Sequence, residues 1–381
     1  GLMTGRYPNR FGIRTTVIPP WREDGLDENE ETLADMLARN GYSNRAIIGK
    51  WHLGHTRKVH YPINRGFSHF YGHLNGAIDY FDHMREGELD WHNDWETCYD
   101  KGYSTELITQ EAVRCINTYE KEGPFLLYVA YNAPHTPLQA QEKDIELYCD
   151  DFGSLTPKEQ KRVTYQAMVS CMDRGIGTIV DALKKKGIMD NTFLIFFSDN
   201  GPAGVPGSSS GKLRGRKFDE WDGGVRVPAV FYWKRAESNY KNLSSQVTGF
   251  VDIVPTLKEL VGDKNRPERA YDGISILPLL IGSTSCIDRN FYLGCGAVVN
   301  KDYKLIRKGR KPGLNLPQDF LVDYQTDPYE KKNASNGNEQ IVRSLYQVAL
   351  KYDTITPCLP EIPYGKGREG FKAPVEWKVT R

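Results

Sequence analysis

The sequence of 381 residues has no apolar run long enough to cross a membrane and no marked excess of charge of either sign. A transmembrane helix needs about 20 consecutive, mostly apolar residues, and no segment comes close to that. The formal net charge is only +1, so no overall basic field can attract nucleic acid. We therefore expect no membrane span and no nucleic-acid partner, and any anion must be bound by a local site.

The cysteines form no C-x-x-C pair and show no spacing typical of zinc ligands. There are seven of them: Cys98, Cys115, Cys149, Cys171, Cys286, Cys295 and Cys358. Their odd number leaves the pairing open. Zinc held by thiolates is not expected, and no internal repeat divides the chain.

The first three quarters of the chain alternate helical patterns with continuous apolar runs. Helical spacing predicts helices at residues 31–40, 104–119 and 157–186, and apolar runs predict buried strands at residues 43–49, 125–131, 192–197 and 227–233. This alternation is typical of an α/β fold with a large, mainly parallel sheet sandwiched by helices.

The pattern changes after a predicted helix at residues 251–261. Short alternating runs at residues 291–293 and 303–307 precede a last predicted helix at residues 339–351. We expect a large α/β domain at residues 1–285 and a small carboxy-terminal α+β domain with an antiparallel sheet at residues 286–381. The basic run 301–311 is interpreted as a solvated hairpin.

Polar side chains follow three of the predicted strands directly. Residues 49–54 read Gly-Lys-Trp-His-Leu-Gly, residues 132–137 read Asn-Ala-Pro-His-Thr-Pro, and residues 198–201 read Ser-Asp-Asn-Gly. A further loop, residues 213–217, ends in Lys217. Open α/β sheets bind ligands beyond the carboxyl ends of their strands, so we expect these groups to share one cleft. Such a set suits an oxyanion beside a hard metal ion.

Each of these residues alone has an ordinary explanation. Lys50 and Lys217 could be surface residues, and His135 could be a turn residue satisfied by the backbone. Asp199 and Asn200 before a glycine are typical of a turn. Their joint occurrence at strand ends favours a site, because unrelated turns and surface lysines have no reason to converge there.

These blocks, in this order, resemble the sulfatase family of the alkaline phosphatase superfamily. The opening residues 1–8, Gly-Leu-Met-Thr-Gly-Arg-Tyr-Pro, resemble the second half of the family signature that begins Cys-x-Pro-Ser-Arg. Further similarity covers residues 49–54, 132–139, 168–183, 197–202, 214–228, 252–256, 272–280 and 323–330. The pattern is similar to the arylsulfatase A and B group and extends over nearly the whole chain.

The resemblance implies a role for each strand-end residue. Lys50 and Lys217 would hold sulfate oxygens, His52 would act on the nucleophile, and His135 would protonate or polarise the leaving oxygen. Asp199 and Asn200 would bind calcium.

The nucleophile of this family is a formylglycine made from the signature cysteine. The match starts just past that residue, so we expect the cysteine, its neighbouring arginine and two calcium-binding aspartates upstream of Gly1. None of the cysteines present lies in a Cys-x-Pro-Ser-Arg context. A chain without that segment would be inactive, and because the motif is cut midway we expect a truncated or incomplete sequence.

The substrate is expected to be a sulfated small molecule, with a sulfated carbohydrate favoured over a simple aryl sulfate. Aromatic residues in the stretch 79–103 would stack on sugar rings, or would pack inward as an ordinary insertion. Two other functions stay open: a catalytically silent sulfatase-like protein that binds a glycan, and a phosphoryl hydrolase of the same superfamily. The family resemblance also implies export to the periplasm, the extracellular space or a lysosome, and leaves the oligomeric state open.

Overall fold

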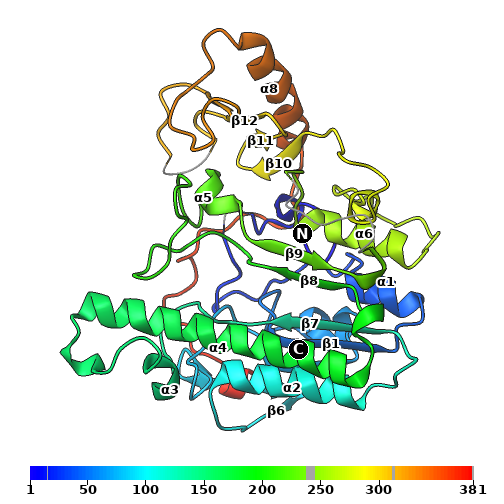
Figure 1. Cartoon of the computed structure of the whole chain (residues 1–381), viewed down its shortest axis with the longest axis vertical. Coiled ribbons are helices and arrows are strands. Elements are labelled where there is room, and N and C mark those ends of the chain that lie inside the picture. The colour runs from blue at the N-terminus through cyan, green and yellow to red at the C-terminus, as the bar shows by residue number, and fades with distance from the viewer. Residues whose placement is uncertain (15, 237–244, 311–313, 380–381) are drawn as a thin grey trace.

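The computed structural model describes residues 1–14, 16–236, 245–310 and 314–379. Figure 1 shows a helix-covered sheet region with a smaller strand-and-helix region stacked against one end. The expected α/β architecture with an additional antiparallel sheet is confirmed.

The central sheet has the strand order β6-β5-β2-β1-β7. Strand β1 pairs in parallel with β2 on one side and with β7 on the other, and the short strands β5 and β6 extend the β2 edge in antiparallel fashion. The bounds are β1 Asn44–Lys50, β2 His69–His73, β5 His92–Asn93, β6 Glu96–Thr97 and β7 Phe125–Ala130. The sheet is thus mixed but parallel at its centre.

Strand β1 is buried on both faces, which explains its continuous apolar sequence. Ala46 and Ile48 pack with Ile108 and Ala112 of helix α2, whereas Ile47 packs on the opposite face with the residues of helix α1. Successive side chains of a strand point to opposite faces, so one strand contributes to two cores.

Helices α2 (Ser104–Thr118) and α4 (Pro157–Lys186) lie side by side over one face of the sheet (Figure 1). Local sequence determines both ends of α4. The Thr156 side chain and Glu159 form a capping box at its start, and Gly187 ends it with a left-handed φ of 73°. Helices α1 (Leu33–Arg39) and α6 (Ile253–Leu260) cover the other face.

Strands β8 (Leu194–Phe197) and β9 (Ala229–Tyr232) differ from the prediction. They pair antiparallel with each other and, within the described ranges, form a separate two-stranded sheet instead of extending the parallel one. Their apolar sequences indicated burial but held no information about the partner strand or its direction.

The smaller region has an antiparallel sheet in the order β10-β11-β12-β13, with helix α8 (Glu339–Asp353) packed on it. Its strands are β10 Phe291–Gly294, β11 Ala297–Val299, β12 Tyr303–Ile306 and β13 Phe320–Asp323. The interpretation of residues 301–311 as a solvated hairpin is wrong for two of its cations, because Lys304 and Arg307 are buried. Residue 311 lies outside the described part.

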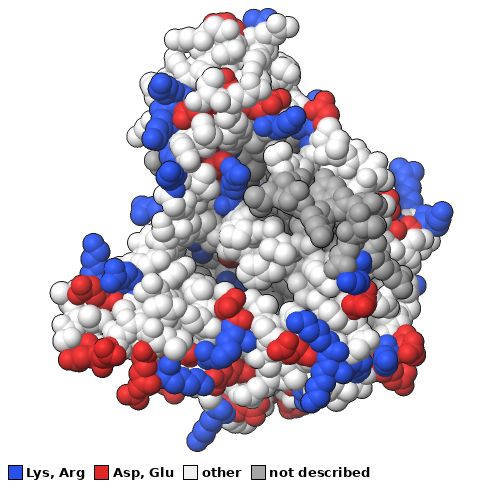
Figure 2. All heavy atoms as spheres, viewed as in Figure 1, with Lys and Arg blue, Asp and Glu red and all other residues white. Residues whose placement is uncertain are grey.

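The remaining elements are short: β3 Met84–Arg85, β4 Glu88–Leu89, α3 Glu142–Ile145, α5 Asp222–Val225 and α7 Leu277–Leu280. Among the described residues, no helix combines the length and apolarity required to cross a bilayer. Acidic and basic side chains are interspersed over the face shown in Figure 2, in keeping with the small net charge.

Candidate active site

The carboxyl ends of β1 and β2 lie unusually close to their neighbours. A Cβ atom on Gly72 would lie 2.2 Å from the Gly49 carbonyl oxygen, and one on Gly49 would lie 2.1 Å from the Ala130 carbonyl oxygen. Gly49 and Gly72 also have φ angles of 106° and 144°, which suit glycine. Only glycine fits at these two places. The tight packing positions Lys50 at the carboxyl end of β1, in the middle of the sheet.

The structure brings together the residues that follow separate strands. Burial lowers the pKa of His135, Lys50 and Lys217 lower it further, and Asp199 opposes them. Lys50 is likewise under the influence of Asp199 and Lys217, and His52 under that of Lys50. These mutual electrostatic effects mean that the charged groups lie within range of one another, as the sequence predicted.

Lys50 is the central cation of this site. Burial lowers the pKa of Lys50 to about 8, with Lys217 and Arg85 acting in the same direction and Asp199 against it. Among the described residues, no carboxylate forms an ion pair with Lys50 or Lys217. At pH 7 Lys50 is still mostly protonated, so its ammonium group can bind an anion.

His52 is neutral and held in one orientation. Its Nε2 lies 3.1 Å from the carbonyl oxygen of Ile18, which can only accept, so Nε2 donates and Nδ1 keeps its lone pair. Burial, followed by the charge of Lys50, lowers the pKa of His52 well below its usual range. A Cβ on Gly76 would come within 2.3 Å of the His52 ring, so a glycine is needed behind it.

His135 is fixed by hydrogen bonds of its ring and of its loop. Its Nδ1 donates to the Thr136 carbonyl oxygen at 2.7 Å, which leaves Nε2 for a ligand. The Tyr80 hydroxyl lies 2.9 Å from the His135 carbonyl oxygen and 2.8 Å from that of Asn132. Tyr80 therefore clamps the loop that carries the imidazole.

Asn132 was not selected from the sequence as a site residue, although it begins the same block. Its side-chain amide is buried, and neither Oδ1 nor Nδ2 has a partner among the described residues. Buried amides of this kind are normally satisfied by water or a ligand. No local sequence signal marks this unpaired amide, since it depends on the surrounding loops.

Asp199 and Asn200 follow β8 at the same edge. The Asn200 amide nitrogen donates to the Gly201 carbonyl oxygen at 2.9 Å, so the amide oxygen remains available. A carboxylate and an amide oxygen are ligands that calcium prefers, and this donor set fits one side of a calcium site. Calcium takes about six to eight oxygens, so these two residues would supply only part of the shell.

The loop that carries Lys217 is anchored to the antiparallel sheet. The Lys217 amide donates to the Pro202 carbonyl oxygen at 2.9 Å, and α5 follows a few residues later. In α5, Asp222 pairs with the buried Lys304 of β12, whose Nζ also lies 2.7 Å from Glu330 Oε1. We call Lys304, Asp222 and Glu330 the buried anchor.

Some aromatic residues of the stretch 79–103 pack inward and others are exposed, so each of the two expected arrangements applies to part of it. Tyr80, His83, Trp91 and His92 are buried, as the inward-packing alternative predicts, while Phe81 and Trp95 are 43% and 42% exposed. The β3–β4 hairpin in this stretch carries Arg85, which the sequence did not single out. The Trp377 indole donates to the Arg85 carbonyl oxygen at 2.9 Å, so the chain's last described residues clamp the hairpin.

A second cluster of metal-type ligands lies away from this edge. His69, Glu111 and Cys115 offer ligand atoms within 4.8 Å of one another. Burial disfavours the charged ring, but hydrogen bonds to Cys115 and Glu111 outweigh it and raise the pKa of His69 to about 10. Arg114 pairs with the same Glu111 carboxylate at 2.6 Å. We interpret the cluster as an ion-pair network around a protonated histidine.

Comparison with known proteins identifies the family of this chain. The family model described as Sulfatase matches residues 1–263. Mouse (Mus musculus) arylsulfatase J is 34% identical over 285 residues, which cover 72% of this chain and 46% of that protein. Mouse N-acetylgalactosamine-6-sulfatase is 31% identical over 304 residues, covering 74% of this chain and 56% of the relative. The chain thus spans about half the length of these curated relatives.

Among solved structures, a crystal structure of Ps i-CgsB in complex with k-i-k-neocarrahexaose aligns with a TM-score of 0.80. It is 28% identical, and the alignment covers 95% of this chain and 83% of that chain. The similarity therefore includes the antiparallel sheet as well as the central one.

Proposed function

Because this chain belongs to the sulfatase family, we propose that the protein hydrolyses sulfate esters of a carbohydrate. One observation carries the proposal: Lys50 and Lys217, neither in an ion pair with a described carboxylate, act on the same imidazole of His135. A pair of half-buried cations beside an imidazole is suited to an anionic ester whose leaving oxygen needs a proton.

The two lysines would bind the sulfate oxygens. Each ammonium can form charge-assisted hydrogen bonds, which are about twice as strong as neutral ones. The partial removal of Lys50 from solvent, visible in its lowered pKa, increases the gain when an anion arrives. Charge that develops on the sulfate group during the reaction would be stabilised by the same contacts.

The two imidazoles would manage protons on opposite sides of the sulfate. His135 uses Nδ1 for the Thr136 carbonyl oxygen and keeps Nε2 for a ligand, and a bound anion would favour its protonated form, so it can donate to the leaving oxygen. His52 keeps a free lone pair on Nδ1 and is neutral, so it can accept a proton from the nucleophile's side.

Two groups absent from the described residues complete the proposal. Formylglycine, made from a cysteine upstream of Gly1, would supply the attacking oxygen, and calcium held in part by Asp199 and Asn200 would supply positive charge. The available oxygens of these two residues support the calcium proposal.

The carbohydrate substrate rests on the relatives. One relative is named for a sulfated N-acetylgalactosamine, and one solved structure contains k-i-k-neocarrahexaose. We propose the same class of substrate here, and we also propose export from the cytoplasm on the family resemblance.

The first test uses the full-length protein from its natural gene. Intact mass and peptide mapping would look for residues before Gly1 and for a cysteine converted to formylglycine. Hydrolysis of 4-methylumbelliferyl sulfate would then be compared with that of the matching phosphate. We expect formylglycine and a preference for the sulfate ester.

Variants assign the roles. Lys217→Ala and His135→Ala should each lower kcat/KM for a sulfate ester about 100-fold, and Asp199→Ala should reduce the calcium content measured by elemental analysis. A natural protein without the cysteine signature that still binds sulfated glycans would favour the silent glycan-binding function. Faster hydrolysis of the phosphate would favour the phosphoryl hydrolase.

A further inference from the structure

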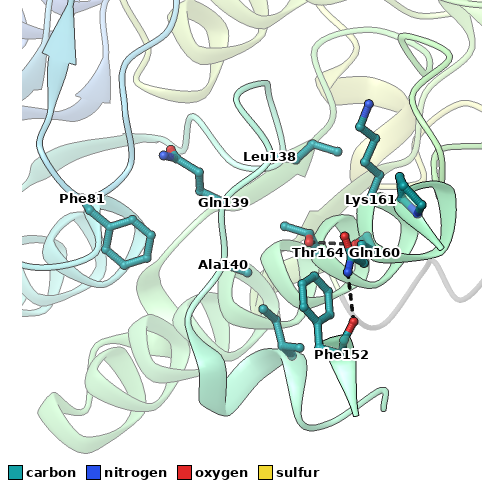
Figure 3. Close-up of a pocket in the computed structure, with 10 residues that line it drawn as sticks. Phe81, Leu138, Gln139, Ala140, Phe152, Gln160, Lys161 and Thr164 are labelled. Carbon is teal, nitrogen blue, oxygen red and sulfur yellow. Dashed lines mark hydrogen bonds between the residues drawn. The ribbon is translucent and has the colours of Figure 1, made fainter. Parts of the chain in front are cut away.

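A pocket of about 410 Å³ opens beside the loop that carries His135. Figure 3 shows Phe81 on one side, Lys161 of α4 on the other, and Ala140 and Phe152 between them. Residues 138–140 of the lining come three to five positions after His135. These residues continue the chain directly from His135, so this wall of the pocket belongs to the same loop.

The aromatic wall is exposed and yet held in place. Phe81 is 43% exposed, its ring lies 5.2 Å from that of Tyr103, and its amide is fixed by the Asp79 carboxylate at 2.9 Å. The Tyr103 hydroxyl donates to the Gln139 carbonyl oxygen at 2.8 Å. An aromatic ring that faces solvent from a rigid support is suited to stack on the apolar face of a sugar.

Gln139 links this wall to the loop of His135. Its side-chain oxygen accepts from the Tyr80 amide at 2.9 Å, and its nitrogen donates to Asp79 at 2.5 Å. The hydroxyl of the same Tyr80 clamps the His135 loop. Gln139 is therefore a positioning residue, and hydrogen bonds through Tyr80 connect the pocket wall to the backbone of His135.

The opposite wall supplies a charge. Lys161 is exposed and has no ion-pair partner within the described part of the chain, and Gln160 next to it is held by the Phe152 carbonyl oxygen at 3.1 Å. An ammonium group opposite an aromatic ring can bind a sugar that carries a negative substituent.

We propose that this pocket binds a second sugar residue, next to the one whose sulfate is cleaved, and that Lys161 contacts a carboxylate or sulfate on it. The substrate would then be an anionic oligosaccharide, bound with one ring against Phe81. This inference rests on the proposed function, because the neighbouring site must cleave the first sulfate.

The experiment compares substrates that differ only in length. Full-length protein would be screened against sulfated oligosaccharides, k-i-k-neocarrahexaose among them, and the best one paired with the monosaccharide that carries the same cleaved sulfate. Phe81→Ala should raise KM for the oligosaccharide about tenfold, and Phe81→Tyr should restore it. Lys161→Gln should raise the same KM about fivefold and weaken its dependence on salt.

The matched control is Lys158→Gln, which changes an exposed lysine of the same helix outside the pocket lining. It should leave both KM values unchanged, and no variant should alter KM or kcat for the monosaccharide. Equal effects on both substrates, no effect on either, or no preference for the oligosaccharide would overturn the pocket assignment while leaving the sulfatase proposal intact. If the protein without any substitution hydrolysed no sulfate ester, both the pocket assignment and the sulfatase proposal would be wrong.

Discussion

Two lysines of this protein differ in whether carboxylates surround them. Lys304, 1% exposed, has Asp222 and Glu330 as partners and also donates to the Glu220 carbonyl oxygen at 3.1 Å. Lys50 has no carboxylate in an ion pair within the described residues, and its environment lowers its pKa to about 8. Removing a cation that has buried carboxylates as partners leaves them uncompensated and destabilises a fold, whereas a cation without such partners itself costs stability and is available for a ligand.

The difference predicts separate consequences for stability and activity. The buried anchor joins the antiparallel sheet to the loop of Lys217, so disrupting it should lower the free energy of unfolding. Lys50 lies at the end of β1, where an anion is proposed to bind, so replacing it should lower kcat/KM.

The largest effect is expected for Lys304→Met. The substitution leaves Glu330 buried without its cation and Asp222 with only the exposed Arg226, and the free energy of unfolding should fall by about 3–5 kcal/mol. Urea denaturation followed by circular dichroism measures it. Lys301→Met, an exposed lysine of the same segment, should change little. A loss below about 1 kcal/mol for Lys304→Met would contradict the structural role of Lys304.

Lys50→Met should act in the opposite sense. We expect kcat/KM for a sulfate ester to fall about 100-fold, or about 2.7 kcal/mol, because the anion loses a cation. The free energy of unfolding should stay within about 1 kcal/mol or rise, since no carboxylate is left unpaired. Lys58→Met, at an exposed position, is the control. Destabilisation comparable with that of Lys304→Met would show that Lys50 is structural.

The pH dependence sharpens the same contrast. Because the pKa of Lys50 is lowered to about 8, its charge is present below that pH and is lost as pH rises through it. We expect kcat/KM to fall by about tenfold per pH unit well above pH 8. In Lys50→Arg the residual activity should not show this fall, because a guanidinium stays charged. An unchanged alkaline limb in that variant would assign the titration to another group.

The smallest effect is expected at the rim of the buried anchor. Arg226 pairs with Asp222 at 3.5 Å, but its side chain is 66% exposed. Arg226→Gln should therefore lower the free energy of unfolding by less than about 0.5 kcal/mol in the same denaturation experiment. A loss approaching that of Lys304→Met would mean that exposure does not separate the two cations of Asp222.

The fold could be predicted wherever the signal is local. Helix α4 has the predicted bounds, because Thr156, Pro157 and Glu159 define its start and Gly187 defines its end. The apolar runs of β1 and β7 also indicated strands correctly, but only β1 has a buried centre, and β7 is half-buried along its length. The pairing of β8 with β9 and the burial of Lys304 could not be predicted, since both depend on partners far away in the sequence.

The site shows the same division. Lys50, His135, Asp199 and Lys217 were expected to meet because each follows a strand or lies in the adjoining loop, and the structure does place them together. Their roles stay predictions, as does the domain boundary after residue 285. Arg85 and the unpaired amide of Asn132 could not be predicted, because only the folded loops bring them to this edge.

The clamp of Trp377 on the Arg85 hairpin has a consequence for biosynthesis. The clamp joins residues 292 positions apart, so translation delivers Lys50, His135 and Lys217 well before the residue that fixes the hairpin beside Lys50. Domains generally fold as units while the chain emerges from its amino terminus. The central sheet can therefore form on the ribosome before Trp377 is synthesised and can hold the β3–β4 hairpin beside Lys50. A premature stop before the Trp377 codon would produce a folded sheet whose hairpin lacks this hydrogen bond.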